Sequence, residues 1–138
     1  STDIDLALSV IKQAPFALRL SSVGFFPLRR APESVWAGVA ASEQLEHLHK
    51  TIDRALIRCS VKPEGRKYLP HVTIGRFAKK RSPNGERLGD YLSQHNLFST
   101  DEFEVDNFSL FSSHRSGSGR IYIEEANYPF EIAGSDLL

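Results

Sequence analysis

Several features that are common in other proteins are scarce or missing in this sequence. It has no methionine and a single cysteine, Cys59, so an internal disulfide is excluded. No apolar run approaches the roughly 18 residues of a membrane-spanning helix, and no signal peptide is recognisable. Seventeen basic and seventeen acidic residues cancel, which argues against a broad nucleic-acid or membrane surface but leaves room for a local basic site. These absences predict a reducing, cytoplasmic setting.

The residues that are present have the composition of an ordinary globular protein. With 138 residues, of which 41% are hydrophobic and 25% charged, the chain is long enough for one domain over residues 1–138 with a real core. Periodic apolar residues predict helices over 2–14, 42–56 and 86–95, and strands over 16–24, 35–40, 68–77, 103–111 and 120–125. The irregular alternation of helices and strands, with neighbouring strands that can be antiparallel, predicts an α+β fold.

The strand predicted at residues 68–77 carries the most informative pattern. Alternation places His71 and Thr73 on one side, and Val72, Ile74 and Arg76 on the other, so one face is apolar and the other polar. A histidine can exchange a proton near neutral pH, and a hydroxyl two residues away, at roughly 6.6 Å, can bind an oxygen of the same substrate. The alternative is a half-buried histidine beside an ordinary β-strand threonine, since a single H-x-T triplet is short.

Other segments offer weaker candidates for contact with an anion. Arg29 and Arg30 lie in a predicted loop, and residues 79–81 form a basic turn after the central strand. A predicted loop over 112–120, rich in serine, glycine and arginine, could close over a phosphate, although it lacks the spacing of a P-loop. In each case a solvated surface segment is the alternative.

The central strand also resembles a known family signature. His71 to Ile74, preceded by Pro70 and followed by Arg76, is similar to the second H-x-T-x motif of the 2H phosphoesterases, in particular the 2'-5' RNA ligase-like RNA 2',3'-cyclic phosphodiesterases. Four further segments extend the resemblance over nearly the whole chain: residues 15–20, 23–27, 35–39 and 108–113.

The chain departs from the family pattern in one respect. Family members carry two H-x-T-x motifs, one in each of two similar lobes, and the first precedes the helix that corresponds to residues 2–14. None of His47, His49, His95 and His114 is interpreted as this first motif. His47 and His49 also form a poor metal pair, because residues two apart do not share a helix face. We therefore expect the first motif to lie upstream, in a longer protein of which this chain is a truncated or processed part, with loss of the motif as the alternative.

The resemblance implies a 2H phosphoesterase fold, with two pseudo-symmetric lobes around a cleft and incomplete here at the N-terminus. It also implies hydrolysis of an RNA-terminal 2',3'-cyclic phosphate to a 2'-phosphate, in which one histidine removes a proton from water and a second protonates the leaving ribose oxygen. His71 fills one of these roles, and Thr73 holds a non-bridging oxygen. Arg76 supports the phosphate, and Arg115 contacts substrate from a hairpin that borders the cleft.

The mechanism implied by the resemblance needs neither a metal nor another cofactor. The partners that the resemblance implies for the protein are RNA 3' ends or nucleoside 2',3'-cyclic phosphates, and no membrane is involved. Reversible 2'-5' RNA ligation is implied as a secondary activity. A non-catalytic nucleotide or RNA 3'-end binding module and a structural interaction domain are the alternatives. We expect a monomer for the full-length protein, and dimerisation or swapping through exposed strand edges for this chain.

Overall fold

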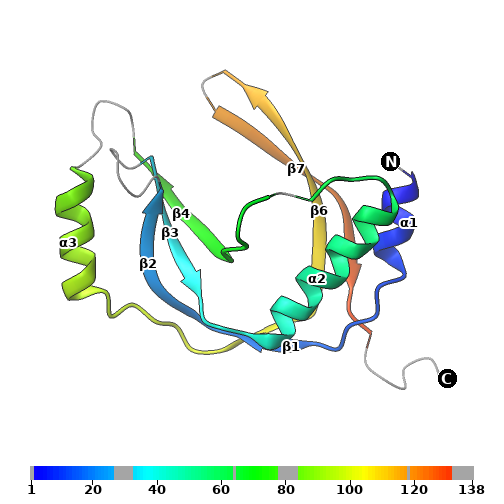
Figure 1. Cartoon of the computed structure of the whole chain (residues 1–138), viewed down its shortest axis with the longest axis horizontal. Coiled ribbons are helices and arrows are strands. Elements are labelled where there is room, and N and C mark those ends of the chain that lie inside the picture. Colours follow the sequence, from blue (N-terminus) through cyan, green and yellow to red (C-terminus); the bar gives the residue numbers. More distant parts are fainter. Residues whose placement is uncertain (1, 27–32, 64, 78–83, 118, 132–138) are drawn as a thin grey trace. The chain divides into compact units, whose positions relative to one another are not determined.

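The computed structural model describes residues 2–26, 33–63, 65–77, 84–117 and 119–131 (Figure 1). Helices and strands alternate along this part of the chain, as the predicted α+β fold requires. Their order is α1 Thr2–Ser9, β1 Phe16–Leu18, β2 Leu20–Phe26, β3 Ser34–Val39, α2 Glu43–Arg58, β4 His71–Arg76, α3 Gly85–His95, β5 Phe103–Val105, β6 Asn107–Ser116 and β7 Gly119–Pro129. No helix among these described residues is both long enough and apolar enough to cross a membrane.

The chain forms two compact units, each discontinuous in sequence. Unit 1 comprises Ser1–Phe16, Glu43–Gly65 and Glu104–Leu138, and unit 2 comprises Ala17–Ser42 and Arg66–Phe103. Unit 1 therefore contains α1, α2, β6 and β7, whereas unit 2 contains β2, β3, β4 and α3. The two units are described separately below.

Unit 2 is built on an antiparallel sheet with the strand order β2-β3-β4. Phe25 and Ala37 are almost fully buried on one face of this sheet. Helix α3 covers that face on the β2 side (Figure 1), and a Cβ at Gly89 would lie only 3.9 Å from the Phe25 ring. Asn84 caps α3 by accepting hydrogen bonds from the amides of Glu86 and Arg87.

Residues 96–100 cover the outer edge of β2. The side chain of Asn96 accepts from the Val23 amide at 2.7 Å and donates to the Val23 carbonyl at 2.8 Å, as a neighbouring strand would. The Ser22 amide donates to the Phe98 carbonyl at 2.8 Å, and Ser22 itself has a positive φ of 69° where the β2 register shifts. Residues 96–100 thus bond to backbone groups on the β2 edge of the sheet, whereas β4 forms the other edge.

Unit 1 combines α1 and α2 with the β6–β7 hairpin (Figure 1). Its core contains Leu8, Leu48, Ala55 and Tyr128, all at most 7% exposed. The buried Tyr128 hydroxyl donates to Asp5 in α1 at 2.6 Å and so ties β7 to that helix. An aromatic cluster extends this core, with ring centroids 5.0 to 6.2 Å apart, and is formed by Phe16, Phe108, Tyr128 and Phe130.

The largest differences from the predicted elements lie in the first helix and in the segment 112–120. The first helix ends at Ser9 rather than at residue 14. The Ser9 hydroxyl bonds back to the Leu6 carbonyl at 2.8 Å, and the chain before Pro15 is not helical, as the residue before a proline tends not to be. The predicted loop over 112–120 is largely strand, because β6 continues to Ser116 and β7 begins at Gly119.

Polar cross-strand contacts explain why this serine-rich segment is a hairpin. Ser112 donates to Glu125 at 2.9 Å, and Arg120 donates to Ser113 at 2.9 Å. Gly117 at the turn has a φ of 59°, which glycine adopts without steric cost. Of the other predicted loop contacts, Arg29, Arg30 and 79–81 lie outside the described residues.

Candidate active site

His71 and Thr73 lie on the same face of β4, as their spacing predicts. In the register with β3, His71 pairs with Gly38 and Thr73 pairs with Trp36. This face is opposite to the face that buries Phe25 and Ala37, since Trp36 and Ala37 are adjacent in the strand. An imidazole and a hydroxyl therefore stand side by side on the sheet face that α3 does not cover.

A β-bulge changes the predicted direction of Arg76. Val35 pairs with Gly75 and Trp36 with Thr73, so Ile74 is an extra residue in β4. Beyond the bulge the alternation is reversed, and Arg76 pairs with Ser34, two residues before Trp36. The prediction that Arg76 faces away from His71 was therefore wrong, because it assumed an unbroken period of two. The register places His71, Thr73 and Arg76 on one face.

One hydrogen bond fixes the orientation and the tautomer of His71. Its Nδ1 lies 2.7 Å from the carbonyl oxygen of Leu69. Because a carbonyl can only accept, Nδ1 carries the proton, and in the neutral ring the lone pair lies on Nε2. Nε2 is thus able to accept a proton from a substrate, or to donate one when the ring is charged. The exposure of the side chain leaves room for a substrate.

Two aromatic rings support the His71 imidazole. Phe26 meets it edge to face, with centroids 5.4 Å apart and an interplanar angle of 77°, and Trp36 lies at 5.9 Å. The Phe26 and Trp36 rings also contact each other at 5.2 Å. Gly24 makes room for the indole, since a Cβ at Gly24 would overlap the Trp36 ring. The sequence showed Phe26 and Trp36 only as hydrophobic residues, and only the strand register reveals that they flank the histidine.

Val72 and Ile74, on the predicted apolar side of the strand, are not buried. Their exposed fractions are 46% and 60%, and every residue of β4 is exposed. These side chains are exposed because β4 is the edge strand of the sheet and α3 lies on the β2 side. His71 is likewise exposed rather than half-buried.

Arg115, the remaining predicted site residue, lies on β6 in unit 1 and pairs in register with Arg120 of β7. Its guanidinium is exposed. The substrate contact predicted for Arg115 therefore stays a prediction. Arg115 was expected in a loop, but it lies in strand β6. The strand fixes the direction of the Arg115 side chain.

The triplet His49-Lys50-Thr51 also has the H-x-T spelling, although His49 was not interpreted as part of a motif from the sequence. This triplet lies in α2, where residues two apart do not share a face. Its side chains have local partners: Thr51 donates to the His47 carbonyl at 2.9 Å, and His49 lies 3.6 Å from Asp53. It does not reproduce the strand geometry of His71 and Thr73. Across the described part of the chain, no group of three or more His, Cys, Asp or Glu side chains is placed to hold a metal ion.

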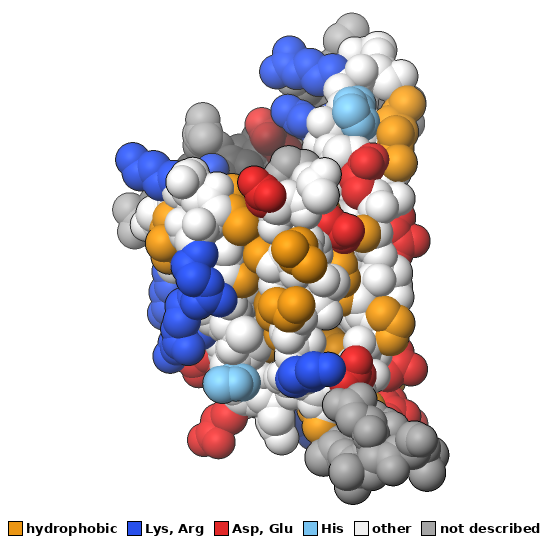
Figure 2. Space-filling model, turned by 90° about the vertical axis from the view of Figure 1, so that its right-hand side faces the viewer, with side chains coloured by type: hydrophobic (Ala, Val, Ile, Leu, Met, Phe, Trp, Pro, Cys, Tyr) orange, Lys and Arg blue, Asp and Glu red, His pale blue; other side chains and the backbone are white. Residues whose placement is uncertain are grey.

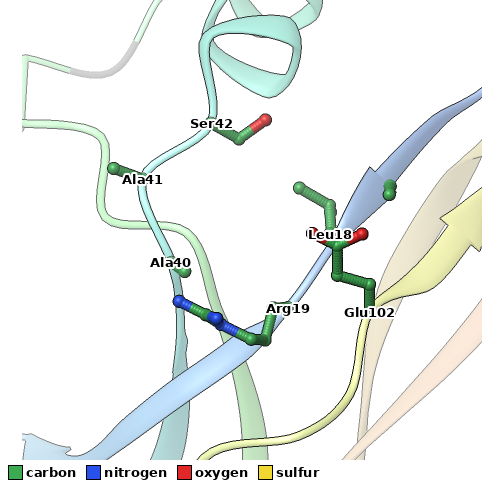
Figure 3. A pocket seen from close by; sticks show the side chains of 7 residues that line it. Leu18, Arg19, Ala40, Ala41, Ser42 and Glu102 are labelled. Carbon is green, nitrogen blue, oxygen red and sulfur yellow. The ribbon is translucent and has the colours of Figure 1, made fainter.

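Unit 2 also contains a small pocket that is separate from the His71 face (Figure 3). Arg19 and Glu102 supply its charged side chains, and the remaining lining consists of Ala17, Leu18, Ala40, Ala41 and Ser42. The two opposite charges give the pocket no preference for a cation or an anion. None of His71, Thr73 and Arg76 lines it.

The class to which this arrangement belongs is established by comparison with known proteins. The sequence model of the 2'-5' RNA ligase superfamily matches residues 3–117, and the chain belongs to this family.

Individual relatives carry a more specific name. The chain is 32% identical over 120 residues to an RNA 2',3'-cyclic phosphodiesterase of Methanocaldococcus jannaschii, covering 87% of this chain and 64% of the relative. It is 29% identical over 110 residues to the protein of the same name in Methanothermobacter thermautotrophicus, covering 80% and 58%. The chain thus spans about three fifths of the length of these relatives.

Solved structures confirm the fold. A crystal structure of TT0787 from Thermus thermophilus matches with a TM-score of 0.68 and 20% identity, over 92% of this chain and 68% of that one. LigT of E. coli, solved in complex with 3'-AMP, matches with a TM-score of 0.64 and 22% identity, over 94% and 67%. At this level of identity the likeness concerns the fold alone.

Proposed function

We propose that this chain provides half of the acid/base machinery of an RNA 2',3'-cyclic phosphodiesterase. The observation that carries the proposal is the orientation of His71. Its Nδ1 donates to the Leu69 carbonyl while Nε2 has no hydrogen-bond partner among the described residues, and Thr73 and Arg76 share its sheet face. A proton-transfer group, a hydroxyl donor and a guanidinium on one face are the elements that a phosphodiester substrate needs. The name carried by the relatives supports this substrate class.

In the proposed reaction, water attacks the phosphorus of the cyclic phosphate and the bond from phosphorus to the ribose 3' oxygen breaks. One group takes a proton from water, another gives a proton to the 3' oxygen, and the product is a 2'-phosphate. His71 Nε2 performs one of these transfers. Thr73 donates to a non-bridging oxygen, and the guanidinium of Arg76 stabilises the negative charge. No metal is required by this scheme.

The same displacement supports 2'-5' ligation as a secondary activity. A 5'-hydroxyl of a second RNA then takes the place of water, and the 3' oxygen leaves as before. In the reverse reaction the 3' oxygen attacks the phosphorus of the 2'-5' bond and the 5' oxygen leaves, and the same groups serve it by microscopic reversibility. Ligation therefore depends on His71 to the same degree as hydrolysis.

The test is turnover of a nucleoside 2',3'-cyclic phosphate by the chain and by His71→Ala, with EDTA present and phosphorus NMR to identify the product. We expect a 2'-phosphate whose rate of formation falls roughly 10²–10⁴-fold in the variant, the usual contribution of a proton-transfer group. His95→Ala is the matched control, because His95 also bonds a backbone carbonyl but lies in α3. Equal turnover by the chain and by His71→Ala would contradict the proposal.

A second candidate is a non-catalytic module that binds nucleotides or RNA 3' ends. This candidate is favoured because only one H-x-T triplet of this chain, at His71, lies in a strand, whereas the reaction needs two proton-transfer groups. In that case the chain shows no turnover, but its affinity for a 2'-phosphorylated nucleoside falls in His71→Ala. Isothermal titration of both proteins separates this candidate from the enzyme.

A further inference from the structure

One face of the β6–β7 hairpin combines arginine and aromatic side chains. In the register, Ser113 pairs with Tyr122 and Arg115 pairs with Arg120. The hydrogen bond from Arg120 to Ser113 shows that these side chains share a face. Phe111 lies two residues before Ser113 and so joins them. We call this set, Phe111, Ser113, Arg115, Arg120 and Tyr122, the Arg–Tyr face.

The two aromatic rings of the Arg–Tyr face do not serve the core. Phe111 is 55% exposed and Tyr122 is 57% exposed. The core side of the hairpin is the other one, where Phe108 pairs with the buried Tyr128. Large exposed aromatic side chains are more typical of a binding surface than of a solvated strand.

The two arginines form an electrostatically unfavourable pair. Like charges directly opposite each other on two strands destabilise a hairpin. Within the described part of the chain, neither guanidinium forms an ion pair with a carboxylate, and Glu124 on the same face accepts hydrogen bonds from Ser109 at 2.6 Å and Asn127 at 3.4 Å instead. At the top of Figure 2, Lys or Arg side chains lie on the left and hydrophobic side chains on the right, with a histidine between them. A bound polyanion would relieve the repulsion.

We propose that the Arg–Tyr face binds single-stranded RNA, with bases stacked on Tyr122 and Phe111 and phosphates held by Arg115 and Arg120. The proposal rests on the proposed function for its choice of RNA, and gives unit 1 an RNA-binding surface of its own. Stacking on aromatic rings suits single strands, whose bases are free, and tolerates any base. A neutral protein gains RNA affinity in this way from one local surface.

The test measures binding of a labelled single-stranded RNA of roughly ten nucleotides with an ordinary 3'-hydroxyl, a length in the range that such surfaces occupy. Tyr122→Ala should weaken binding by about 5- to 100-fold, the loss expected for one stacked base. Ile121→Ala and Ile123→Ala are matched controls, because these neighbours are 50% and 47% exposed but lie on the opposite face of β7. They should stay within about twofold of wild type, far below the loss of one stacked base.

Salt dependence gives a readout that a purely structural role would not change. In Arg120→Gln, the slope of log K against log salt should become shallower by about 0.7, the value for one phosphate contact to a single strand. An unchanged slope, or an affinity of Tyr122→Ala within about twofold of wild type, overturns the proposal, since either shows that one of its contacts is not made. Circular dichroism of each variant confirms the fold.

This test is independent of the phosphodiesterase. The RNA carries no cyclic phosphate, so absence of hydrolysis leaves the binding result intact. Conversely, His71-dependent turnover of a mononucleotide together with unchanged RNA binding in Tyr122→Ala overturns only the proposal that the Arg–Tyr face binds RNA.

Discussion

At the scale of single residues, Tyr128 couples the stability of unit 1 to pH. Burial raises the pKa of Tyr128 to about 12, and the hydrogen bond to Asp5 and the charge of that carboxylate act in the same direction. The unfolded tyrosine ionises near pH 10, whereas the folded tyrosine keeps its proton to about pH 12. The contribution of Tyr128 to the free energy of unfolding is therefore fully present below about pH 10 and is lost as the pH rises toward 12.

We expect Tyr128→Phe to remove most of this pH dependence. Between pH 10 and 12 the wild-type protein should lose on the order of 2–3 kcal/mol from this residue, and the variant should lose much less. At neutral pH the variant should be less stable by about 1–2 kcal/mol, because it lacks the hydrogen bond to Asp5. Urea unfolding at several pH values measures both effects. Tyr91→Phe, at an exposed tyrosine, is the control, and parallel curves for Tyr128→Phe and wild type would contradict the argument.

The site residues show what a sequence reveals at this scale. The period of two in a strand was enough to place His71 and Thr73 on one face. Their surroundings were not predictable, because the hydrogen bond from His71 to the Leu69 carbonyl depends on the chain before β4, and the contacts with Phe26 and Trp36 depend on the neighbouring strands. Local periodicity predicts the direction of a side chain but not its tertiary contacts.

At the scale of elements, the C-terminus of α2 offers a test of backbone strain. The Val61 amide donates to the Leu56 carbonyl at 3.0 Å and the Ser60 amide to the Ile57 carbonyl at 2.9 Å, which together form a Schellman motif. Ser60 occupies the left-handed position with a φ of 64°, where glycine is usual. The helix therefore ends with a residue that is strained by its Cβ.

Ser60→Gly should stabilise the protein by about 0.5–1 kcal/mol, because relief of the strained conformation outweighs the greater freedom of glycine in the unfolded chain. Urea unfolding followed by circular dichroism measures the change. Ser60→Ala is the matched control, since it removes the hydroxyl and retains the Cβ, and it should give no gain. A loss of stability in Ser60→Gly would show that the conformation is not strained.

Two elements differ from their predictions for the same physical reason. The register of β4 depends on its pairing with β3, so the bulge at Ile74, and with it the direction of Arg76, has no signature in the segment alone. The strands of the β6–β7 hairpin were predicted, but its outer part was predicted as a loop, because polar contacts such as Ser112 to Glu125 stabilise it rather than an alternating apolar pattern. In both cases the partner strand decides the structure.

At the scale of the whole molecule, the open edge of β4 predicts association. In the order β2-β3-β4, residues 96–100 bond to β2, while no strand pairs with the outer edge of β4 in the described ranges. Val72 and Ile74 are exposed along this edge strand, and an unpaired apolar edge is a template for a second chain. The bulge at Ile74 shortens the regular segment, so the association should be weak.

We expect sedimentation to show a concentration-dependent rise from monomer to dimer for this chain. Ile74→Lys should remain monomeric, because a charge on an edge strand opposes pairing with a second copy. Leu97→Lys is the control, since it adds the same charge at a side chain that is 91% exposed but outside β4. If Leu97→Lys abolishes association and Ile74→Lys does not, the contact lies on the β2 side of the sheet. A single monomeric species for the wild-type chain at all concentrations would instead mean that the bulge alone is enough to protect the edge.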